Sequence, residues 1–152
     1  MAVSAPRPPA LVNARLVTPE GVKPGAIRVA DGRIDALGEC SAQPGDSVVD
    51  AKGALAAPGL VDFGVFAVDK PAFHFGGITR AALMPDQSPM LDLPSRVSYI
   101  AKSGKPDLWV HPLAAATRGL AGSELAELAL MKEAGARGVA TGRGWIADSG
   151  VM

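Results

Sequence analysis

The chain has 152 residues and a formal net charge of +0 from 15 basic and 15 acidic side chains. It therefore holds one ordinary domain or one domain and part of another, and it offers no electrostatic footprint for nucleic acid or an anionic membrane. Its share of hydrophobic residues, 48%, excludes disorder. Few of these residues are aromatic, which predicts an aliphatic core typical of α/β proteins.

The cellular compartment is predicted from what the sequence lacks. A single cysteine, Cys40, cannot form an internal disulfide, and no apolar run approaches the roughly 20 residues that span a bilayer. The opening "MAVSAPRPPA" lacks the apolar stretch of a secretory signal. We therefore expect a cytoplasmic protein, with no membrane attachment, whose partners are proteins or small molecules.

The first third of the chain predicts a small antiparallel β side sheet over residues 10–56. Residues 1–9 contain three prolines and are expected to form a flexible leader. A strand then ends at the turn residues Pro19, Glu20 and Gly21. Asp31 and Gly32 separate two apolar runs, which is a strong signal for a β-hairpin. The stretch "SVVDAKG" adds another short strand.

Residues 57–152 show a different pattern, typical of a parallel sheet. Four strands are expected, at "GLVDFGVF", "ITRAALM", "LWVHPLA" and "GVAT". Each is a nearly continuous apolar run, as in strands that are buried on both faces. The order of elements, with helices between parallel strands, predicts an α/β unit.

Two helices are expected between these strands. The first begins at Asp92 and Pro94 and ends at Gly104. The second begins at Ser123 as its N-cap and ends at Gly135, with a buried stripe formed by Leu125, Leu128 and Ala129. The connection over residues 67–76 is too short for an ordinary crossover helix. We expect an irregular segment there, which would leave a groove on the sheet uncovered.

Several motifs, taken in order, resemble the dihydroorotase family of the amidohydrolase superfamily. They are "LVNARLVTPEG", "VVDAKGALAAPGLVD", "GGITRAALMPDQSP", "HPLAAATRGLAGSELAEL", "EAGARG" and "IADSGVM". The resemblance covers nearly the whole chain. It implies a metal-bearing (β/α)₈ barrel with a side sheet, in which residues 57–152 would form an incomplete first half of the barrel. It also implies an activity that closes carbamoyl aspartate reversibly to dihydroorotate.

The same resemblance implies that the metal ligands are missing. Relatives carry a His-x-His pair directly after "GLVD", and the corresponding positions here are Gly64 and Phe66. Neither residue has a lone pair to donate to a metal ion. A metal-bridging carboxylate of the family corresponds to Thr141 or Gly142. We therefore expect no catalytic residue and no metal site in this chain.

Substrate contacts are also altered relative to the family. An arginine that pairs with the substrate carboxylate falls in the shortened stretch "AVDKPAF", where Lys70 is the nearest cation. A substrate-binding asparagine corresponds to Ser88, which cannot supply an amide's paired donor and acceptor. His74 and His111 remain as candidates for binding, each with packing as the alternative role, and His111 is expected at the end of a strand.

These observations predict a pseudoenzyme, a non-catalytic dihydroorotase homologue that acts as a structural or assembly partner in pyrimidine biosynthesis. The resemblance suggests aspartate transcarbamoylase as the partner. Because half a barrel leaves sheet edges and an apolar face uncovered, we expect a homo-oligomer or completion by another chain. The alternative is an active zinc-dependent amidohydrolase, a cyclic amide hydrolase, whose ligands lie outside these 152 residues.

Overall fold

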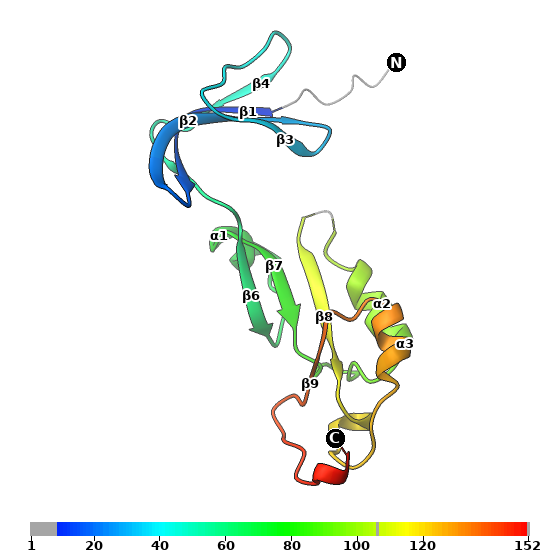
Figure 1. Cartoon of the computed structure of the whole chain (residues 1–152). Coiled ribbons are helices and arrows are strands. Elements are labelled where there is room, and N and C mark those ends of the chain that lie inside the picture. The colour runs from blue at the N-terminus through cyan, green and yellow to red at the C-terminus, as the bar shows by residue number, and fades with distance from the viewer. Residues whose placement is uncertain (1–8, 106, 152) are drawn as a thin grey trace, which may run out of the picture. The chain divides into compact units, whose positions relative to one another are not determined.

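The structure is a computed structural model that describes residues 9–105 and 107–151. Of the leader expected at residues 1–9, only Pro9 lies within the described residues, and it begins the first strand. Contacts divide the chain into two compact units between Pro58 and Gly59 (Figure 1). Each unit is described by itself.

The first unit is a five-stranded sheet with the order β3-β2-β1-β4, in which β5 also pairs with β1. Its strands are β1 (Pro9–Thr18), β2 (Gly21–Ala30), β3 (Arg33–Gly38), β4 (Ser47–Asp50) and β5 (Leu55–Ala56). The predicted hairpin is confirmed. Asp31 and Gly32 connect β2 to β3 with φ values of 50° and 72°, as a tight hairpin turn requires.

The expectation of a purely antiparallel sheet was wrong, because β4 and β5 both run parallel to β1. Residues 39–46 carry the chain from β3 to the other side of β1, where β4 enters in the same direction as β1. The alternation of apolar and polar residues identifies a strand. It does not encode the direction of the neighbouring strand. The observed pairing, antiparallel to β2 and parallel to β4 and β5, makes the sheet mixed.

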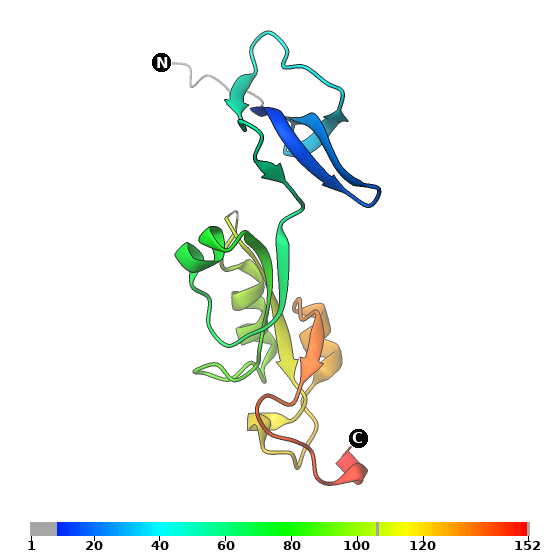
Figure 2. The same ribbon diagram turned by 90° about the vertical axis from the view of Figure 1, so that its left-hand side faces the viewer.

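The second unit contains the four predicted parallel strands, in the order β6-β7-β8-β9 (Figure 2). They are β6 (Leu60–Val65), β7 (Ile78–Leu83), β8 (Trp109–Ala115) and β9 (Gly138–Ala140), and every neighbouring pair is parallel. The predicted parallel sheet is confirmed. Two short 3₁₀ turns, η1 (Arg118–Leu120) and η2 (Ser149–Val151), lie in the loops after β8 and β9.

The first predicted helix is confirmed as α2 (Pro94–Lys102). Pro94 stands in its first turn, where a missing N–H costs nothing. Val97 is fully buried, and Ile100 packs against the core. The helix ends before Gly104, whose φ of +85° is a left-handed conformation that suits glycine.

The second predicted helix, α3 (Leu128–Glu133), begins five residues later than expected. Residues 123–127 instead pair with the chain that follows β8, through Arg118 N to Glu124 O at 2.9 Å and Ala126 N to Ala116 O at 3.1 Å. These backbone hydrogen bonds override the local helix signal at Ser123. The helix ends at Glu133 with Ala134 as its C-cap, and the expected Gly135 follows directly, where its N–H donates to the carbonyl of Lys132.

The predicted buried stripe of α3 is therefore partly wrong. Leu125 is 47% exposed, and Ala129 is exposed as well. Ala126 and Met131 are buried in their place, and Leu128 is half-buried. The shift follows from the later start of the helix, which changes the side chains that face the sheet.

The connection from β6 to β7 holds a short helix, α1 (Lys70–Phe75), where we expected an irregular segment. Asp69 caps it by accepting a hydrogen bond from Ala72 N at 3.1 Å. Six residues make less than two turns, so the connection holds no ordinary crossover helix, as expected. Phe73 packs against the core, and α1 lies beside the amino-terminal ends of β6 and β7 (Figure 1).

The core of this unit lies between one face of the sheet and helices α2 and α3 (Figure 1). Its buried members are aliphatic side chains and one methionine: Val65, Ala81, Leu83, Leu91, Val97, Leu108, Val110, Ala114, Ala126 and Met131. The other face of the sheet is open, and Phe63 on it is 83% exposed. This uncovered face agrees with the expectation for half a barrel. No helix of the described ranges is long and apolar enough to cross a membrane.

Candidate functional site

The carboxyl ends of β6, β7 and β9 bring a small polar cluster together. Phe66 directly follows β6, Asp86 follows β7, and Arg143 follows β9. The Arg143 guanidinium carbon lies 4.3 Å from the centre of the Phe66 ring. Its backbone N–H donates to Asp86 Oδ1 at 2.9 Å. Ligand sites of parallel sheets lie at this edge, so the cluster is the candidate site of the unit.

Gln87 fixes the backbone of this edge. Its Nε2 donates both to the carbonyl of Phe66, at 3.2 Å, and to the carbonyl of Met84, at 3.0 Å. Met84 N in turn donates to Val65 O at 2.9 Å, which continues the pairing of β6 and β7 beyond the strands. Gln87 therefore holds Phe66 in position under the Arg143 guanidinium.

Asp86 governs the shape of the loop after β9. A side chain at Gly142 would place its Cβ 2.6 Å from Asp86 Oδ1, and Gly142 has a φ of +70°. Both facts require glycine at this position. Asp86 Oδ2 is buried and has no hydrogen-bond partner among the described residues. Burial of a carboxylate oxygen without a hydrogen-bond partner costs free energy. The cluster thus contains one acceptor that no described residue satisfies.

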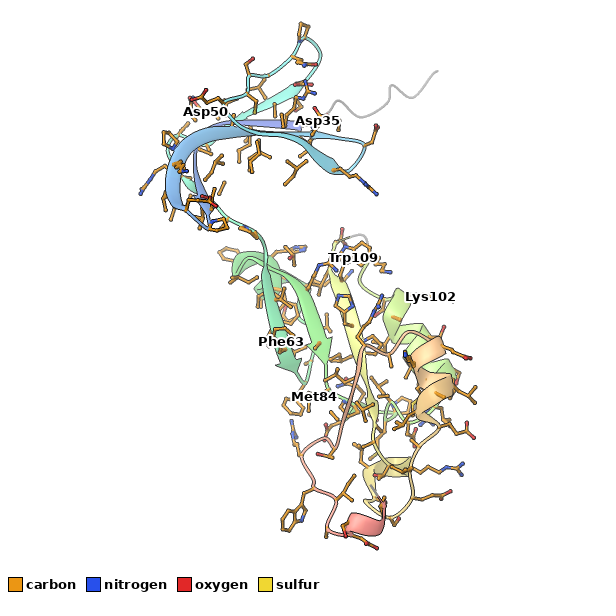
Figure 3. The ribbon with its side chains drawn as sticks, in the orientation of Figure 1. Asp35, Asp50, Phe63, Met84, Lys102 and Trp109 are labelled. Atoms are coloured by element: carbon orange, nitrogen blue, oxygen red, sulfur yellow. The ribbon has the colours of Figure 1, made fainter. Side chains whose placement is uncertain are left out.

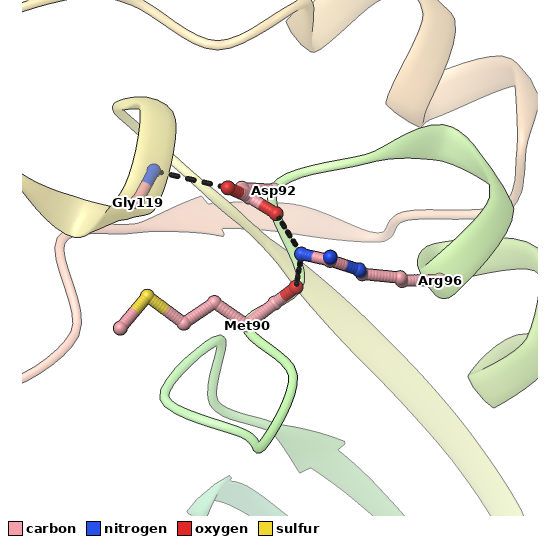
Figure 4. A network of polar contacts seen from close by, with 4 residues as sticks. All are labelled: Met90, Asp92, Arg96 and Gly119. Carbon is pink, nitrogen blue, oxygen red and sulfur yellow. Dashed lines mark hydrogen bonds and ion pairs between the residues drawn. The ribbon is translucent and has the colours of Figure 1, made fainter.

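A second polar network ties the loop after β8 to the start of α2 (Figure 4). Asp92 Oδ1 accepts from Arg96 Nη1 at 2.6 Å, and Asp92 Oδ2 accepts from Gly119 N at 3.0 Å. Arg96 Nη1 also donates to the carbonyl of Met90 at 3.1 Å. The network fixes the η1 turn, and its polar atoms satisfy one another. Its role is therefore the positioning of the loop.

The predicted metal-ligand positions lie at the carboxyl edge. Gly64 N donates to Asp62 Oδ1 at 3.1 Å, and Phe66 is stacked under Arg143. Thr141 is exposed, and Gly142 packs against Asp86.

The predicted substrate-binding candidates are scattered. Lys70 Nζ lies 3.5 Å from Asp107 Oδ2, and His74 Nε2 lies 3.4 Å from the carbonyl of Asp107. Asp107 lies two residues before the start of β8, so Lys70 and His74 lie at the amino edge of the sheet. Ser88 is exposed in the loop after β7. The structure does not bring Lys70 and His74 to the carboxyl edge.

His111 was expected at the end of a strand, but it is the third residue of β8. Its Nε2 lies 3.3 Å from Arg80 Nη1. Partial burial lowers the pKa of His111, and the positive charges of Arg80, Arg137 and Lys105 lower it further. A neutral imidazole at this position accepts the hydrogen bond from Arg80.

The residues at the carboxyl edge do not fit a zinc ion. Zinc in proteins takes nitrogen, sulfur or carboxylate ligands, usually three or four of them. Within residues 9–105 and 107–151, no group of three or more His, Cys, Asp or Glu side chains is placed to hold a metal ion. Phe66 and Gly64 offer no donor atom, and the guanidinium above Phe66 carries a permanent positive charge.

Sequence reasoning missed Asp86, Gln87 and Arg143. The signal was present, because Asp86 and Gln87 follow one predicted parallel strand and Arg143 follows another. The rule that polar residues after parallel strands gather at one edge would have grouped them. The stacking of Arg143 on Phe66 has no sequence signal, since it depends on how the two loops fold back.

Comparisons with known proteins agree with this architecture. No protein-family model matches the chain. The chain is 38% identical over 124 residues to a dihydroorotase of Pelotomaculum thermopropionicum, a match that covers 72% of the chain and 29% of that protein. It is 35% identical over 129 residues to a dihydroorotase of Geobacter sp. (strain M21), covering 74% and 30%.

In sequence, the chain is similar to dihydroorotases. It spans about 30% of the length of these curated relatives. Two solved structures share the fold of this dihydroorotase-like chain. An L-hydantoinase (dihydropyrimidinase) from Arthrobacter aurescens matches with a TM-score of 0.71 and 24% identity, over 88% of the chain and 32% of that protein. A dihydroorotase matches with a TM-score of 0.55 and 14% identity, over 84% and 39%.

A third structure, an N-acyl-D-glutamate deacylase from Bordetella bronchiseptica complexed with zinc and a phosphonate inhibitor, matches with a TM-score of 0.55 and 23% identity, over 72% of the chain and 30% of that protein. These neighbours confirm the predicted fold class, in which a parallel sheet of an amidohydrolase (β/α) barrel follows a separate sheet.

Proposed function

We propose that this dihydroorotase-like chain is a non-catalytic homologue that serves as a structural or assembly partner in pyrimidine biosynthesis. One observation carries the loss of catalysis. At the carboxyl edge, Arg143 covers the ring of Phe66 at 4.3 Å, and the adjoining Gly64 has no side chain. Hydrolysis of a cyclic amide by a metal enzyme needs an ion that activates water. Among the described residues, this edge supplies a fixed cation and the carboxylates of Asp62 and Asp86, and it holds no group of three ligands for such an ion.

An assembly role is supported by the surfaces that the sheet leaves uncovered. Parallel sheets are ordinarily covered on both faces and shielded at their edges. Here β6 and β9 each pair with one strand among the described residues, and the face that carries Phe63 is open. We infer that further polypeptide covers this face, and we propose another protein chain as its source. The dihydroorotase-like sequence makes aspartate transcarbamoylase the partner to test first.

The loss of catalysis is tested by metal content and turnover. Protein purified without chelators is expected to contain far less than one zinc per chain by elemental analysis, and to hydrolyse dihydroorotate no faster than buffer. About one zinc per chain, together with turnover that a chelator abolishes, would contradict the proposal.

The assembly role is tested by co-expressing the chain with aspartate transcarbamoylase from the same source. Size-exclusion chromatography is expected to show one complex that contains both chains. Separate elution of the two proteins at micromolar concentration would rule out this partner, and it would leave the conclusion about catalysis standing.

A second candidate function follows from the small share of its relatives' length that the chain covers. The chain spans about 30% of their length, so the ligands of an active zinc-dependent amidohydrolase would have to come from outside these 152 residues. Under this alternative, addition of the missing polypeptide would restore dihydroorotate turnover that a chelator abolishes. The stacked Phe66 and Arg143 argue against it, because they would have to separate before a metal ion could approach this edge.

A further inference from the structure

Three loops at the carboxyl edge of the parallel sheet hold one another through a closed set of contacts. Gln87, after β7, donates to the carbonyl of Phe66, after β6, at 3.2 Å. Asp86, also after β7, accepts from the backbone N–H of Arg143, after β9, at 2.9 Å. Arg143 completes the set, because its guanidinium carbon lies 4.3 Å from the centre of the Phe66 ring. We call Phe66, Asp86, Gln87 and Arg143 the carboxyl-edge clamp.

The contact between Phe66 and Arg143 joins strands that are not neighbours. In the sheet, β7 and β8 lie between β6 and β9. Strands are spaced by about 4.8 Å, so three spacings would separate β6 from β9 by about 14 Å in a flat sheet. A backbone hydrogen bond cannot span that distance. The side chains of Phe66 and Arg143, carried by their loops, therefore make a connection that strand pairing cannot make.

The backbone at this edge is shaped to fit the clamp. Gly142 has a φ of +70°, and a Cβ there would lie 2.6 Å from Asp86 Oδ1, so the loop after β9 reaches Asp86 only because it carries glycine. On the other side, Met84 N donates to Val65 O at 2.9 Å and extends the pairing of β6 and β7. Figure 3 shows Met84 at this edge and Phe63 within β6. Each of the three loops is thus fixed to both of the others.

The chemistry of the clamp differs from that of a metal centre. Its members offer one carboxylate, from Asp86, beside an aromatic ring and a permanent cation. A zinc ion takes three or four nitrogen, sulfur or carboxylate ligands. The stack itself is a source of stability, because a cation over the face of a partly exposed ring changes an equilibrium constant by about 2- to 5-fold. The Phe66 ring belongs to this class, since the residue is 40% exposed.

We propose that the carboxyl-edge clamp holds the loops after β6, β7 and β9 in one closed arrangement, and that it does so without a metal ion. Loss of the contact between Phe66 and Arg143 loosens the loops at both ends of that contact. The inference goes beyond the proposed function, because it concerns how this edge is held together. It does not depend on turnover or on the identity of a partner.

Hydrogen exchange of single backbone amides, measured by NMR on the 152-residue chain, tests the clamp. The variant Phe66→Leu removes the ring and leaves Arg143 and its loop unchanged in sequence. We expect the Arg143 amide, which donates to Asp86, to exchange about 2- to 5-fold faster than in the wild-type chain. The matched control is Phe63→Leu, the same change on β6 at a ring that is 83% exposed. It should leave exchange of the Arg143 amide unchanged.

A second amide separates local loosening from a general loss of stability. Val97 N, in the buried part of α2, donates to the carbonyl of Leu93 at 3.2 Å, and its exchange should change less than that of Arg143. Equal acceleration of the Val97 and Arg143 amides in Phe66→Leu would overturn the proposal. So would equal exchange of the Arg143 amide in Phe66→Leu and Phe63→Leu.

The absence of a metal requirement is tested on the wild-type chain. Neither added zinc nor a chelator should change the exchange rate of the Arg143 amide. Slower exchange with zinc that a chelator reverses would show that a metal ion closes this edge, and it would overturn the proposal.

Circular dichroism checks the folding of each variant. If Phe66→Leu is unfolded, Arg143→Met replaces it, because it removes the cation and leaves the ring in place. The reporter is then the amide of Met84, which donates to Val65 O and should exchange about 2- to 5-fold faster. Arg33→Met, the same change at an exposed position of β3, is the control. Equal exchange of the Met84 amide in the two variants would overturn the proposal.

Discussion

Replacement of Asp92 by alanine should destabilise the parallel-sheet unit measurably. The Asp92 carboxylate accepts from Arg96 Nη1 at 2.6 Å and from Gly119 N at 3.0 Å. Its side chain is 17% exposed, and that of Arg96 is 35% exposed. Alanine removes both acceptors together. It also frees the η1 turn from the start of α2, so the loop after β8 loses its anchor.

The magnitude follows from the two lost interactions. The hydrogen bond from Gly119 to a charged acceptor contributes about 1.5 kcal/mol. The Asp92–Arg96 pair adds about 1 kcal/mol once its exposure is taken into account. We therefore expect Asp92→Ala to lower the free energy of unfolding by about 2–3 kcal/mol. Asp92→Asn keeps one acceptor oxygen and should lose about half as much.

Urea denaturation followed by circular dichroism measures these changes. The matched control is Asp107→Ala, which removes an ion pair with Lys70 at 3.5 Å whose side chains are 54% and 44% exposed. This exposed pair should be worth about 0–1 kcal/mol. The reasoning would be refuted if Asp92→Ala changed stability by no more than Asp107→Ala does.

Two further changes test other parts of the unit. The pKa of His111 is lowered below its ordinary value of 6.5. The unfolded chain therefore binds a proton more readily than the folded one, and the free energy of unfolding should fall as the pH drops below about 6.5. In urea titrations at pH 7 and pH 5, His111→Gln should lose less of this free energy than the wild-type chain does, and an equal loss would exclude His111 as the source. Gly142→Ala combines a φ of +70° with a Cβ at 2.6 Å from Asp86 Oδ1, whereas Gly32→Ala has a φ of +72° and no atom within 4 Å. Backbone strain should lower the free energy of unfolding of both variants by about 1–3 kcal/mol, with the larger loss for Gly142→Ala. Equal losses in urea denaturation would show that the contact with Asp86 is relieved without cost.

The sequence by itself determined the elements whose signals are local. Asp31 and Gly32 fixed the hairpin because their backbone conformation permits a tight turn, and Pro94 marked the start of α2 because proline suits the first turn of a helix. The continuous apolar runs identified all four parallel strands. The order of motifs also identified the family resemblance, which the dihydroorotase relatives support.

Only the tertiary structure decided features that depend on distant partners. The direction of β4 is set by its pairing with β1, and the start of α3 is set by backbone hydrogen bonds from residues 116–126 that replace the local helix signal at Ser123. The stacking of Arg143 on Phe66 joins loops that are 77 residues apart in sequence. The surroundings of His111 likewise depend on register, which places Arg80 beside Trp109 and brings the Arg80 side chain next to His111. Pairing and register are long-range properties, and a single sequence contains no local signal for them.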